Sequence, residues 1–293
     1  MLASIIIRTY NESKHLGALL SAINNQAVEK DSFEIVIVDS GSTDSTLEIA
    51  NNFETRIVNI RKEDFTFGRS LNIGCDAAHG EALVFISGHC IPKGDRWLSE
   101  LIKPLKNNES EYVYGRQIGD EESKYSERQL LNKYFPKESS IPQEGYFCNN
   151  ATSAILKSVW EEDKFDEELT GLEDMALAKQ LVKKSLRIGY VASSVVYHLH
   201  DETWTQVKWR YERESYALRH IMPEVHVSSF DFLRYAINAI FLDIYQAFKD
   251  RMLSKYFIEI IQFRTMQYWG TFKGNQEHRK LSSSMKERYF YPR

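Results

Sequence analysis

Apolar residues in the first hundred positions occur in two kinds of stretch. Residues 4–10, 33–40, 56–60 and 81–88 hold short runs rich in Ile and Val, whereas the stretches between them space apolar residues three and four positions apart. The short runs predict buried strands, and the wider spacing predicts amphipathic helices. Strands that alternate with helices in this way are typical of a parallel sheet covered on both faces. We therefore expect an α/β domain whose ligand binds at the carboxyl ends of the strands.

The rest of the chain continues this pattern and then becomes helical. DRWLSELIKPL and residues 173–185 predict helices, and EYVYGRQI and residues 187–200 predict strands. Residues 119–145 are polar and contain Pro136 and Pro142, so we expect a loop there, with covering a substrate as one use for it. From about residue 203 the spacing is helical, most clearly over 230–270. The predicted domains are 1–202, in halves 1–95 and 96–202, and a helical subdomain at 203–293.

Composition narrows the class of protein. The chain has 293 residues, of which 43% are hydrophobic and 27% charged, as in ordinary globular proteins. A formal net charge of −4 argues against a nucleic-acid partner. Three cysteines, Cys75, Cys90 and Cys148, give no disulfide framework and favour a reducing cytoplasm. The first apolar run predicts a strand instead of a signal peptide, and no run approaches the roughly 20 apolar residues that a spanning helix needs.

Polar motifs follow the first two predicted strands. RTYNE (8–12) follows the first strand, and IVDSGSTDST (37–46) contains the end of the second. Asp39 ends an apolar strand, where its carboxylate can accept hydrogen bonds from a nucleotide base or a ribose hydroxyl. Gly41 permits a tight turn. Helix capping explains residues 42–44 but not Asp39, so the two motifs together indicate a nucleotide site, whereas RTYNE alone also suits a turn and a helix start.

The chain resembles the inverting glycosyltransferases of family 2 over roughly residues 3–200. The resemblance rests on TYNE, VDSGSTDST, FGRSLNIGCDAAHGEALVFI and GLEDMALAKQL, in this order and spacing. FTFGRSLNIG followed by HGEALVFIS is most similar to bacterial polysaccharide members of the rhamnosyltransferase type. The resemblance implies a single Rossmann-like nucleotide-sugar-binding domain with a mostly parallel mixed sheet, and the helical pattern adds a C-terminal α-helical extension. Residues 1–95 would then be the donor half and 96–202 the acceptor half.

The resemblance also implies a set of donor-binding residues. Arg69 and Asn72 would face the pyrophosphate, with a solvated helix face as the alternative explanation for both. The residues implied around the donor are Thr9, Tyr10, Asn11, Glu12, Asp39, Ser40, Gly41, Ser87 and His89.

The segment FISGHCIP departs from the family pattern. In most of the family this strand ends in Asp-x-Asp, and the last Asp binds Mg²⁺ or Mn²⁺; here Ser87 and His89 stand at the two Asp positions. Histidine suits Mn²⁺ and similar or softer divalent ions and is a poor ligand for Mg²⁺. His89 therefore binds such a metal, contacts the diphosphate without metal, or is structural. His198 and His200 alternate on a strand, so they share one face. Some relatives supply a metal ligand there, and an exposed strand end is the alternative.

The acceptor half carries the predicted chemistry. By resemblance, Asp174 of GLEDMALAKQL is the general base that deprotonates the acceptor hydroxyl, and Glu173 positions the acceptor or is structural. The alternative is that both acids only favour a helix start. Asn149 and Asn150 would bind sugar hydroxyls, or belong to a turn. Cys148 has no base near it in sequence, and inverting transfer needs no covalent intermediate.

These observations predict an inverting glycosyltransferase. It would move a sugar from a dTDP- or UDP-sugar to a hydroxyl of a bacterial surface polysaccharide or lipid-linked oligosaccharide. The alternatives are a non-catalytic relative that has lost the metal site, and a nucleotidyltransferase, for which RTYNES lacks the Gly-rich basic loop. The C-terminal helices would pack on the catalytic domain, form a homodimer, or lie on an anionic membrane. We expect a cytoplasmic protein with peripheral contact at the inner membrane face.

Overall fold

The computed structural model describes residues 2–29, 32–277 and 283–291 and divides the chain into two compact units. The sheet unit comprises Met1–Asp120, Tyr134–Glu168 and Glu173–Leu199. The helical unit comprises Glu121–Lys133, Leu169–Leu172 and His200–Arg293.

The sheet unit is built on an eight-stranded mixed sheet with the order β3-β2-β1-β4-β7-β6-β8-β5. β3, β2, β1 and β4 are parallel, as are β6 and β8, whereas β7 and β5 run antiparallel to their neighbours. The predicted mostly parallel mixed sheet is therefore confirmed. The strand bounds are β1 Ala3–Thr9, β2 Phe33–Asp39, β3 Arg56–Asn59, β4 Ala82–Ser87, β5 Cys90–Pro92, β6 Tyr112–Ile118, β7 Thr152–Leu156 and β8 Ile188–His198.

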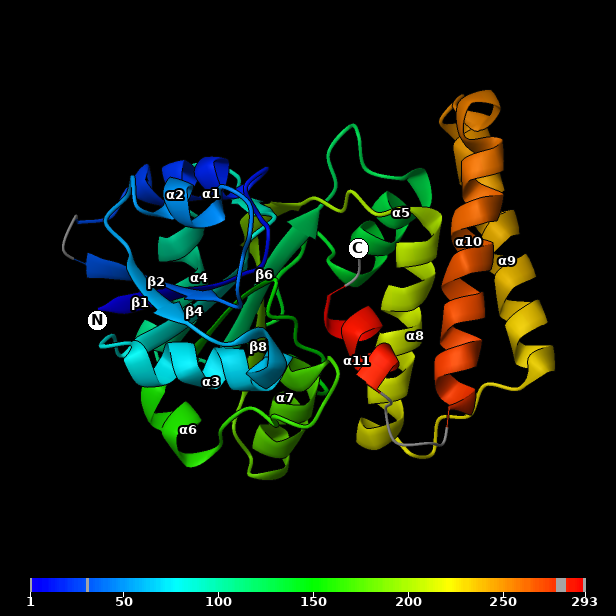
Figure 1. Cartoon of the computed structure of the whole chain (residues 1–293). Coiled ribbons are helices and arrows are strands. Elements are labelled where there is room, and N and C mark those ends of the chain that lie inside the picture. Colours follow the sequence, from blue (N-terminus) through cyan, green and yellow to red (C-terminus); the bar gives the residue numbers. More distant parts are fainter. Residues whose placement is uncertain (1, 30–31, 278–282, 292–293) are drawn as a thin grey trace. The chain divides into compact units, whose positions relative to one another are not determined.

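Helices cover both faces of this sheet (Figure 1). One face packs against α1, α2 and α4, and the other against α3, α6 and α7. Alternate residues of β1 show why the strand is apolar throughout: Ile5 and Ile7 join the core under α1 and α4, while Ile6 meets Gly74 of α3. The helix bounds are α1 Leu16–Asn24, α2 Thr46–Ala50, α3 Phe67–Ala77, α4 Trp97–Lys106, α6 Lys157–Glu162 and α7 Glu173–Lys183, with a short 3-10 helix, η2, at Lys62–Asp64.

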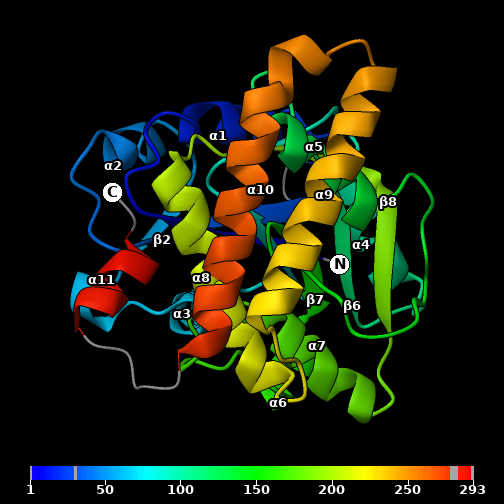
Figure 2. The same cartoon turned by 90° about the vertical axis from the view of Figure 1, so that its right-hand side faces the viewer.

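The helical unit contains α8 Trp204–Ile221, α9 Ser229–Lys249, α10 Leu253–Gln276 and α11 Ser283–Phe290. α9 and α10 form an antiparallel hairpin (Figure 2). A buried ion pair joins them: the Arg264 guanidinium donates to both carboxylate oxygens of Asp243, at 2.7 and 2.9 Å. Over the described ranges, no helix has a stretch long and apolar enough to cross a membrane.

The observed units differ from the predicted boundary at residue 202. The chain leaves the sheet unit after Leu199, and residues 121–133 belong with the C-terminal helices. Their reassignment follows from Tyr125, whose backbone N–H donates to Glu259 (2.6 Å) and whose hydroxyl donates to Asp250 (2.7 Å). The predicted loop over 119–145 is also wrong in part, because α5 spans Tyr125–Tyr134. Few of its residues are apolar, so its local pattern does not indicate a helix.

Two glycines of α10 set the close approach of α8. A Cβ atom on Gly274 would lie 2.0 Å from the carbonyl oxygen of Glu212, and one on Gly270 would lie 2.2 Å from that of Lys208. We expect Gly274→Ala to destabilise the helical unit, because overpacking of about 1–3 kcal/mol opposes a gain in helix propensity of about 1 kcal/mol. Urea unfolding of the full chain, followed by circular dichroism, measures the change.

The matched control for this prediction is Gly17→Ala in α1. Its Cβ would meet the Ile49 side chain at 3.6 Å, which is an ordinary van der Waals contact. We expect this variant to be neutral or slightly more stable than the parent. Equal destabilisation by the two substitutions would contradict the close-packing explanation.

Candidate functional site

Asp39, at the carboxyl end of β2, organises the turn that follows it. One carboxylate oxygen accepts hydrogen bonds from the backbone N–H groups of Gly41 (3.0 Å) and Ser42 (2.9 Å). The other accepts from the hydroxyls of Thr9 (3.0 Å) and Ser42 (2.5 Å). Four hydrogen bonds fill the acceptor capacity of a carboxylate. A ligand group can therefore bind Asp39 only by replacing one of the two hydroxyls.

The loop after β1 is tied to this turn. Asn11 has φ 56°, a left-handed conformation that Asn adopts more readily than most residues. Its side-chain oxygen accepts from the Thr43 N–H (2.8 Å), and its own N–H donates to the Ser42 hydroxyl (2.9 Å). The Glu12 N–H donates to the Thr46 hydroxyl (2.8 Å). Residues 9–12 and 39–46 thus form one hydrogen-bonded cradle, which also includes Ser40, whose N–H and hydroxyl both donate to the Thr9 carbonyl.

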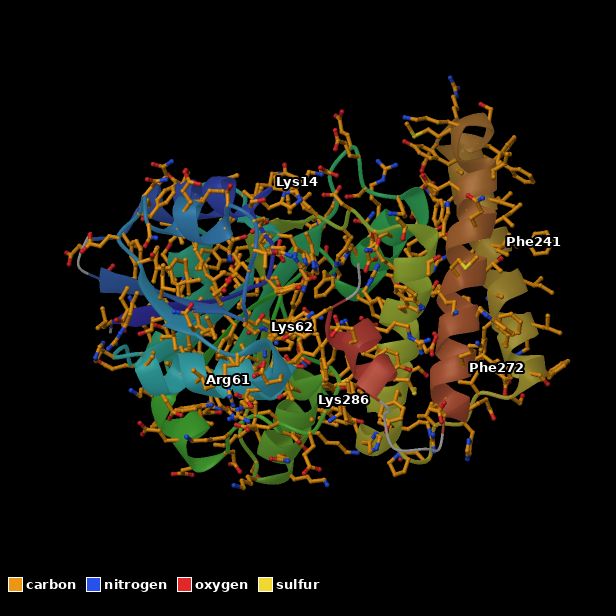
Figure 3. The ribbon with its side chains drawn as sticks, in the orientation of Figure 1. Lys14, Arg61, Lys62, Phe241, Phe272 and Lys286 are labelled. Carbon is orange, nitrogen blue, oxygen red and sulfur yellow. The ribbon has the colours of Figure 1, made fainter. Side chains whose placement is uncertain are left out.

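Lys62 adds a cation to this cradle that the sequence analysis did not select. Its ammonium lies 5.7 Å from the centre of the Tyr10 ring, and its Cβ lies 4.0 Å from where a Cβ on Gly41 would be. Its neighbour Arg61 pairs with Asp64 at 2.6 Å (both basic residues are labelled in Figure 3). An aromatic ring beside a cation suits a base and a phosphate. The available signal was a pair of basic residues, RK, directly after the third predicted strand.

The two residues predicted to face the pyrophosphate have different environments. Arg69 is exposed on α3. Asn72 is buried: its amide nitrogen donates to the Phe165 carbonyl and to Glu167 (2.9 Å each), and its oxygen accepts from the Trp160 indole and the Phe165 N–H (3.1 Å each). The amide is saturated and fastens α3 to residues 160–167. We therefore assign Asn72 a structural role, in place of both a donor contact and a solvated helix face.

His89 lies in the turn after β4, close to the cradle. Its Nδ1 is 3.1 Å from a carboxylate oxygen of Glu12. Because an ionised carboxylate only accepts hydrogen bonds, this contact assigns the proton to Nδ1 and leaves the lone pair of the neutral ring on Nε2. Gly88 makes the approach feasible, since a Cβ there would lie 2.9 Å from the Glu12 side chain. Ser87, at the last position of β4, is partly buried.

His198, the last residue of β8, is held in the same way. Its Nδ1 lies 2.6 Å from the Gln117 side-chain oxygen, while the Gln117 amide nitrogen donates to Asn149 (2.9 Å). This orientation of the amide assigns the proton of His198 to Nδ1. The His89 and His198 rings stack at 5.2 Å with planes 22° apart, and each offers a nitrogen within 4.8 Å of one on the other. Two neighbouring imidazoles whose Nδ1–H groups are held by acceptors can supply two of the ligands of a metal site.

His200 does not share a strand face with His198, because β8 ends at His198 and His200 begins the helical unit. There its Nδ1 lies 2.8 Å from Glu127, which also pairs with Arg210 at 2.7 Å. Burial alone would raise the pKa of the Glu127 carboxyl, but the nearby His200 and Arg210 hold that pKa well below its usual range. The predicted contribution of His200 to a metal site remains a prediction.

Glu173 and Asp174 open α7, and both are buried. The Glu173 carboxylate accepts from the Arg8 guanidinium at 3.1 Å. Within the described part of the chain, the Asp174 carboxylate accepts from two backbone N–H groups, those of Asn150 and Met175, both at 2.7 Å. Burial and the neighbouring Glu173 charge raise the pKa of Asp174 to about 7, against the lowering effect of these hydrogen bonds and of Arg8. A carboxyl that titrates near neutral pH is suited to general base catalysis.

Arg8 is a second residue that the sequence analysis missed. It stands in β1, its guanidinium lies 5.1 Å from the centre of the Phe67 ring, and it donates to the Phe67 carbonyl at 3.1 Å. By pairing with Glu173 it neutralises one of two adjacent acids, and among the described residues no cation forms an ion pair with Asp174. The available signal was a single arginine in an otherwise apolar strand.

The segment before β7 supports the site. The Asn150 side-chain oxygen accepts from the hydroxyls of Tyr112 and Ser153 (2.6 Å each), which fixes the backbone N–H that reaches Asp174. The Asn149 side-chain oxygen accepts a hydrogen bond from the Gln117 amide, so this oxygen also holds the protein segment in place. Burial, with the Asp174 charge, raises the pKa of the Cys148 thiol well above its ordinary value. A protonated, buried thiol agrees with the prediction that Cys148 is not a nucleophile.

A separate hollow of about 870 Å³ lies at the opposite edge of the sheet, by the amino ends of β2 and β3. Its lining includes Asn24, Phe33, Glu34, Thr55 and Arg56, and none of the candidate residues. Open α/β sheets bind ligands at the carboxyl ends of their strands, so we do not place the substrate there.

Comparison with known proteins agrees with this geometry. The family model described as Glycosyl transferase family 2 matches residues 4–162, more than half of the chain. The chain belongs to this family, and it is a glycosyltransferase. The O-antigen chain rhamnosyltransferase RfbN of Salmonella typhimurium is 25% identical over 223 residues, which cover 72% of this chain and 70% of the relative. Glycosyltransferase AglE of Haloferax volcanii is 33% identical over 116 residues, or 38% of each chain.

Solved structures show the same fold. The mannosyltransferase PcManGT from Pyrobaculum calidifontis, in complex with GDP-Man and Mn²⁺, gives a TM-score of 0.66 at 15% identity and covers 94% of this chain and 88% of its own. Residues 1–349 of S. aureus TarS, in complex with UDP-GlcNAc, give 0.57 at 19% identity and cover 87% of this chain and 71% of that one. The predicted Rossmann-like nucleotide-sugar transferase fold is confirmed.

Proposed function

We propose that the protein is an inverting glycosyltransferase in which Asp174 is the general base. The observation that carries this proposal is the contrast at the start of α7. Glu173 is paired with Arg8, whereas Asp174 is buried with its pKa raised to about 7. A module that only binds sugar has no use for such a carboxyl, so the geometry favours an enzyme over a non-catalytic relative. Nothing at residues 9–13 resembles the Gly-rich basic loop of a nucleotidyltransferase.

The reaction follows from these positions. The Asp174 carboxylate takes the proton of the acceptor hydroxyl while that oxygen attacks the anomeric carbon of the donor sugar. The bond from the anomeric carbon to the diphosphate oxygen breaks on the opposite face, and the nucleoside diphosphate leaves with the electron pair. The cradle of residues 9–12 and 39–46 holds the nucleoside, with Tyr10 and Lys62 at its side. Glu173, held by Arg8, positions the acceptor or the helix start.

The chain's residues also fit a divalent metal, with His89 and His198 as ligands. Each ring has its Nδ1–H directed to an acceptor, Glu12 or Gln117, so each can present Nε2. Imidazole ligands select Mn²⁺, Fe²⁺, Co²⁺ or Zn²⁺ over Mg²⁺. A bound ion of this kind would neutralise negative charge on the diphosphate leaving group. The alternative is a direct hydrogen bond from a protonated His89 to the diphosphate. His200, which lies just beyond the end of β8, is a third proposed ligand by resemblance to the family and no longer by strand alternation.

The substrates proposed are a dTDP- or UDP-sugar donor and a glycan or lipid-linked acceptor. The O-antigen rhamnosyltransferase among the relatives supports a bacterial surface polysaccharide as the product. An enzyme that uses a lipid-linked acceptor works at the membrane surface. A cytoplasmic location with peripheral contact at the inner membrane face is therefore part of the proposal.

A donor screen with the purified full-length protein tests this proposal. dTDP-, UDP- and GDP-sugars would be compared by binding calorimetry and by release of nucleoside diphosphate, with and without oligosaccharide acceptors. We expect binding and turnover with one class of donor, and inversion of the anomeric configuration in the product. Tight binding of a sugar nucleotide without release under any acceptor condition would favour the non-catalytic relative. A product with retained configuration would overturn the assigned role of Asp174.

A further inference from the structure

Large apolar side chains crowd the outward surface of the α9–α10 hairpin. Phe241 is 67% exposed, Phe248 68% and Ile258 69%. Figure 3 shows Phe241 projecting from α9 away from α10. We call the whole set the outer face; its members are Phe230, Leu233, Tyr235, Ile237, Phe241, Leu242, Tyr245, Phe248, Met252, Phe257, Ile258, Ile261 and Trp269.

The packing of α9 is inverted relative to an ordinary amphipathic helix. It buries the small residues Ala236, Ala239 and Ala247, whereas all of its aromatic residues except Phe232 are exposed. Six members of the outer face on α9, from Phe230 to Phe248, recur at intervals of three and four residues, so they form one continuous stripe. A helix of 21 residues is about 31 Å long. A continuous exposed apolar stripe along a whole helix marks a surface that docks on a partner or a membrane.

Fully exposed charge on the hairpin is mostly basic. The exposed basic residues from 229 to 273 are Arg234, Lys249, Arg251, Lys255 and Lys273, while Asp250 is the exposed acid of this described segment. Two further acids are partly exposed and already have partners: Asp231 pairs with Arg234 at 3.5 Å, and Glu259 accepts from the Tyr125 N–H. Asp250 is already engaged by the Tyr125 hydroxyl and by Gln246. The whole chain, in contrast, carries −4. The basic character therefore belongs to this hairpin and not to the protein in general.

The basic residues lie at the two ends of the hairpin and not along its middle. Arg234 is near the start of α9 and Lys273 near the end of the antiparallel α10, and the other three surround the turn between the helices. The exposed residues of α9 from 235 to 248 include no charged side chain. Several of the cations sit over rings: Arg234 is 4.7 Å from the Tyr235 centroid, and Lys273 is 5.7 Å from that of Trp269. Aromatic and basic ends around an apolar middle are characteristic of helices that lie in a membrane interface.

We propose that the outer face is a docking site for an anionic lipid surface. Apolar side chains would enter the boundary between headgroups and acyl chains, while the five cations contact negative headgroups. A second copy of the chain fits less well, because a two-fold interface would bring the same cationic patch of each subunit toward the other. Only the use of this docking site rests on the proposed function: docking would hold the enzyme where a lipid-linked acceptor is found. Binding to lipid itself requires no turnover.

Vesicle co-sedimentation of the full-length protein tests the proposal. We expect binding to vesicles that mix phosphatidylcholine with phosphatidylglycerol, weaker binding to phosphatidylcholine alone, and a decrease as salt rises. The double variant Phe241→Ser, Phe248→Ser should bind the anionic vesicles at least about tenfold more weakly, because two aromatic anchors are lost. Both side chains are exposed, so the fold should persist, which circular dichroism checks. Val182→Ser on α7, another exposed apolar position, is the matched control and should bind as the parent does.

Two results would overturn the proposal. If the parent protein is monomeric and sediments with no vesicle, the outer face does not dock on lipid. If it is a dimer by analytical ultracentrifugation and the double variant is a monomer, a second copy covers the face. The inference and the proposed function can fail separately. If the parent protein binds no vesicle but transfers sugar to a soluble acceptor, only the lipid-docking inference is rejected. If the parent protein binds vesicles but turns over no donor, only the proposed function is rejected.

Discussion

Replacing Asp174 with Asn is expected to slow glycosyl transfer by about 100- to 10,000-fold, with little change in donor affinity. That range is the usual contribution of a positioned general base. The amide has nearly the shape of the carboxyl and can still accept one of the two backbone hydrogen bonds, so the start of α7 should be kept. Initial rates at saturating donor, together with calorimetric measurement of donor binding, separate the two effects.

Glu173→Gln is the matched control, because it makes the same change from carboxyl to amide at the adjacent residue. It removes the ion pair with Arg8 but no base, so its effect on the rate should be much smaller. Removing the Glu173 charge should also lower the pKa of Asp174, since that charge helps to raise it. The acid limb of the pH–rate profile should move to lower pH in this variant. A profile that does not move, or a larger loss from Glu173→Gln than from Asp174→Asn, would reassign the base.

The pH dependence has a definite sign. The carboxylate is the active form, so kcat/KM should rise with pH through about 7. Stability should respond in the opposite direction: between the ordinary value of 3.8 and about 7 the native state binds more protons at Asp174 than the unfolded state does. Asp174 therefore lowers stability as pH rises through this window. The Tm of Asp174→Asn minus the Tm of the parent should accordingly increase from pH 5 to pH 8.

Removing divalent metal with EDTA is expected to abolish transfer, and Mn²⁺ should restore it better than Mg²⁺. The reason is the donor set: the position where the family usually has its metal-binding Asp holds His89, and His198 stacks against it at 5.2 Å. His89→Ala and His198→Ala should each greatly weaken Mn²⁺ binding, measured by electron paramagnetic resonance without any substrate. Gln117→Leu, which removes the acceptor of the His198 Nδ1–H, should weaken it by about 10- to 100-fold.

His79→Ala is the matched control for these variants. Like His89, it has Nδ1 at 3.1 Å from a glutamate, but it is exposed and is paired with Glu34, at the amino-terminal side of the sheet. It should leave Mn²⁺ binding unchanged. His200→Ala tests the third proposed ligand. Full activity in EDTA, with no Mn²⁺ signal, would establish the other interpretation, in which His89 contacts the diphosphate directly.

Much of the nucleotide cradle could be predicted from the sequence because its parts are local. Apolar β-branched runs specify buried strands wherever they fall, and the polar residues after them must lie at the carboxyl edge of the sheet. Asp39, Asn11 and Glu12 could be selected on that basis. Their hydrogen bonds could not, since the saturation of Asp39 depends on Thr9, which is thirty positions away.

The sequence by itself determined the fold class, the parallel strands at the amino-terminal half of the sheet and the polar ends of those strands. Tertiary structure alone decided which side chains meet. Arg8 reaches Glu173 across 165 positions, and this pairing, with burial, separates the two adjacent acids. Packing buried Asn72, moved α5 into the helical unit and ended β8 before His200. The alternation of residues predicts which face of an element is apolar, but partners distant in the sequence, and the burial that shifts a pKa, exist only once the chain has folded.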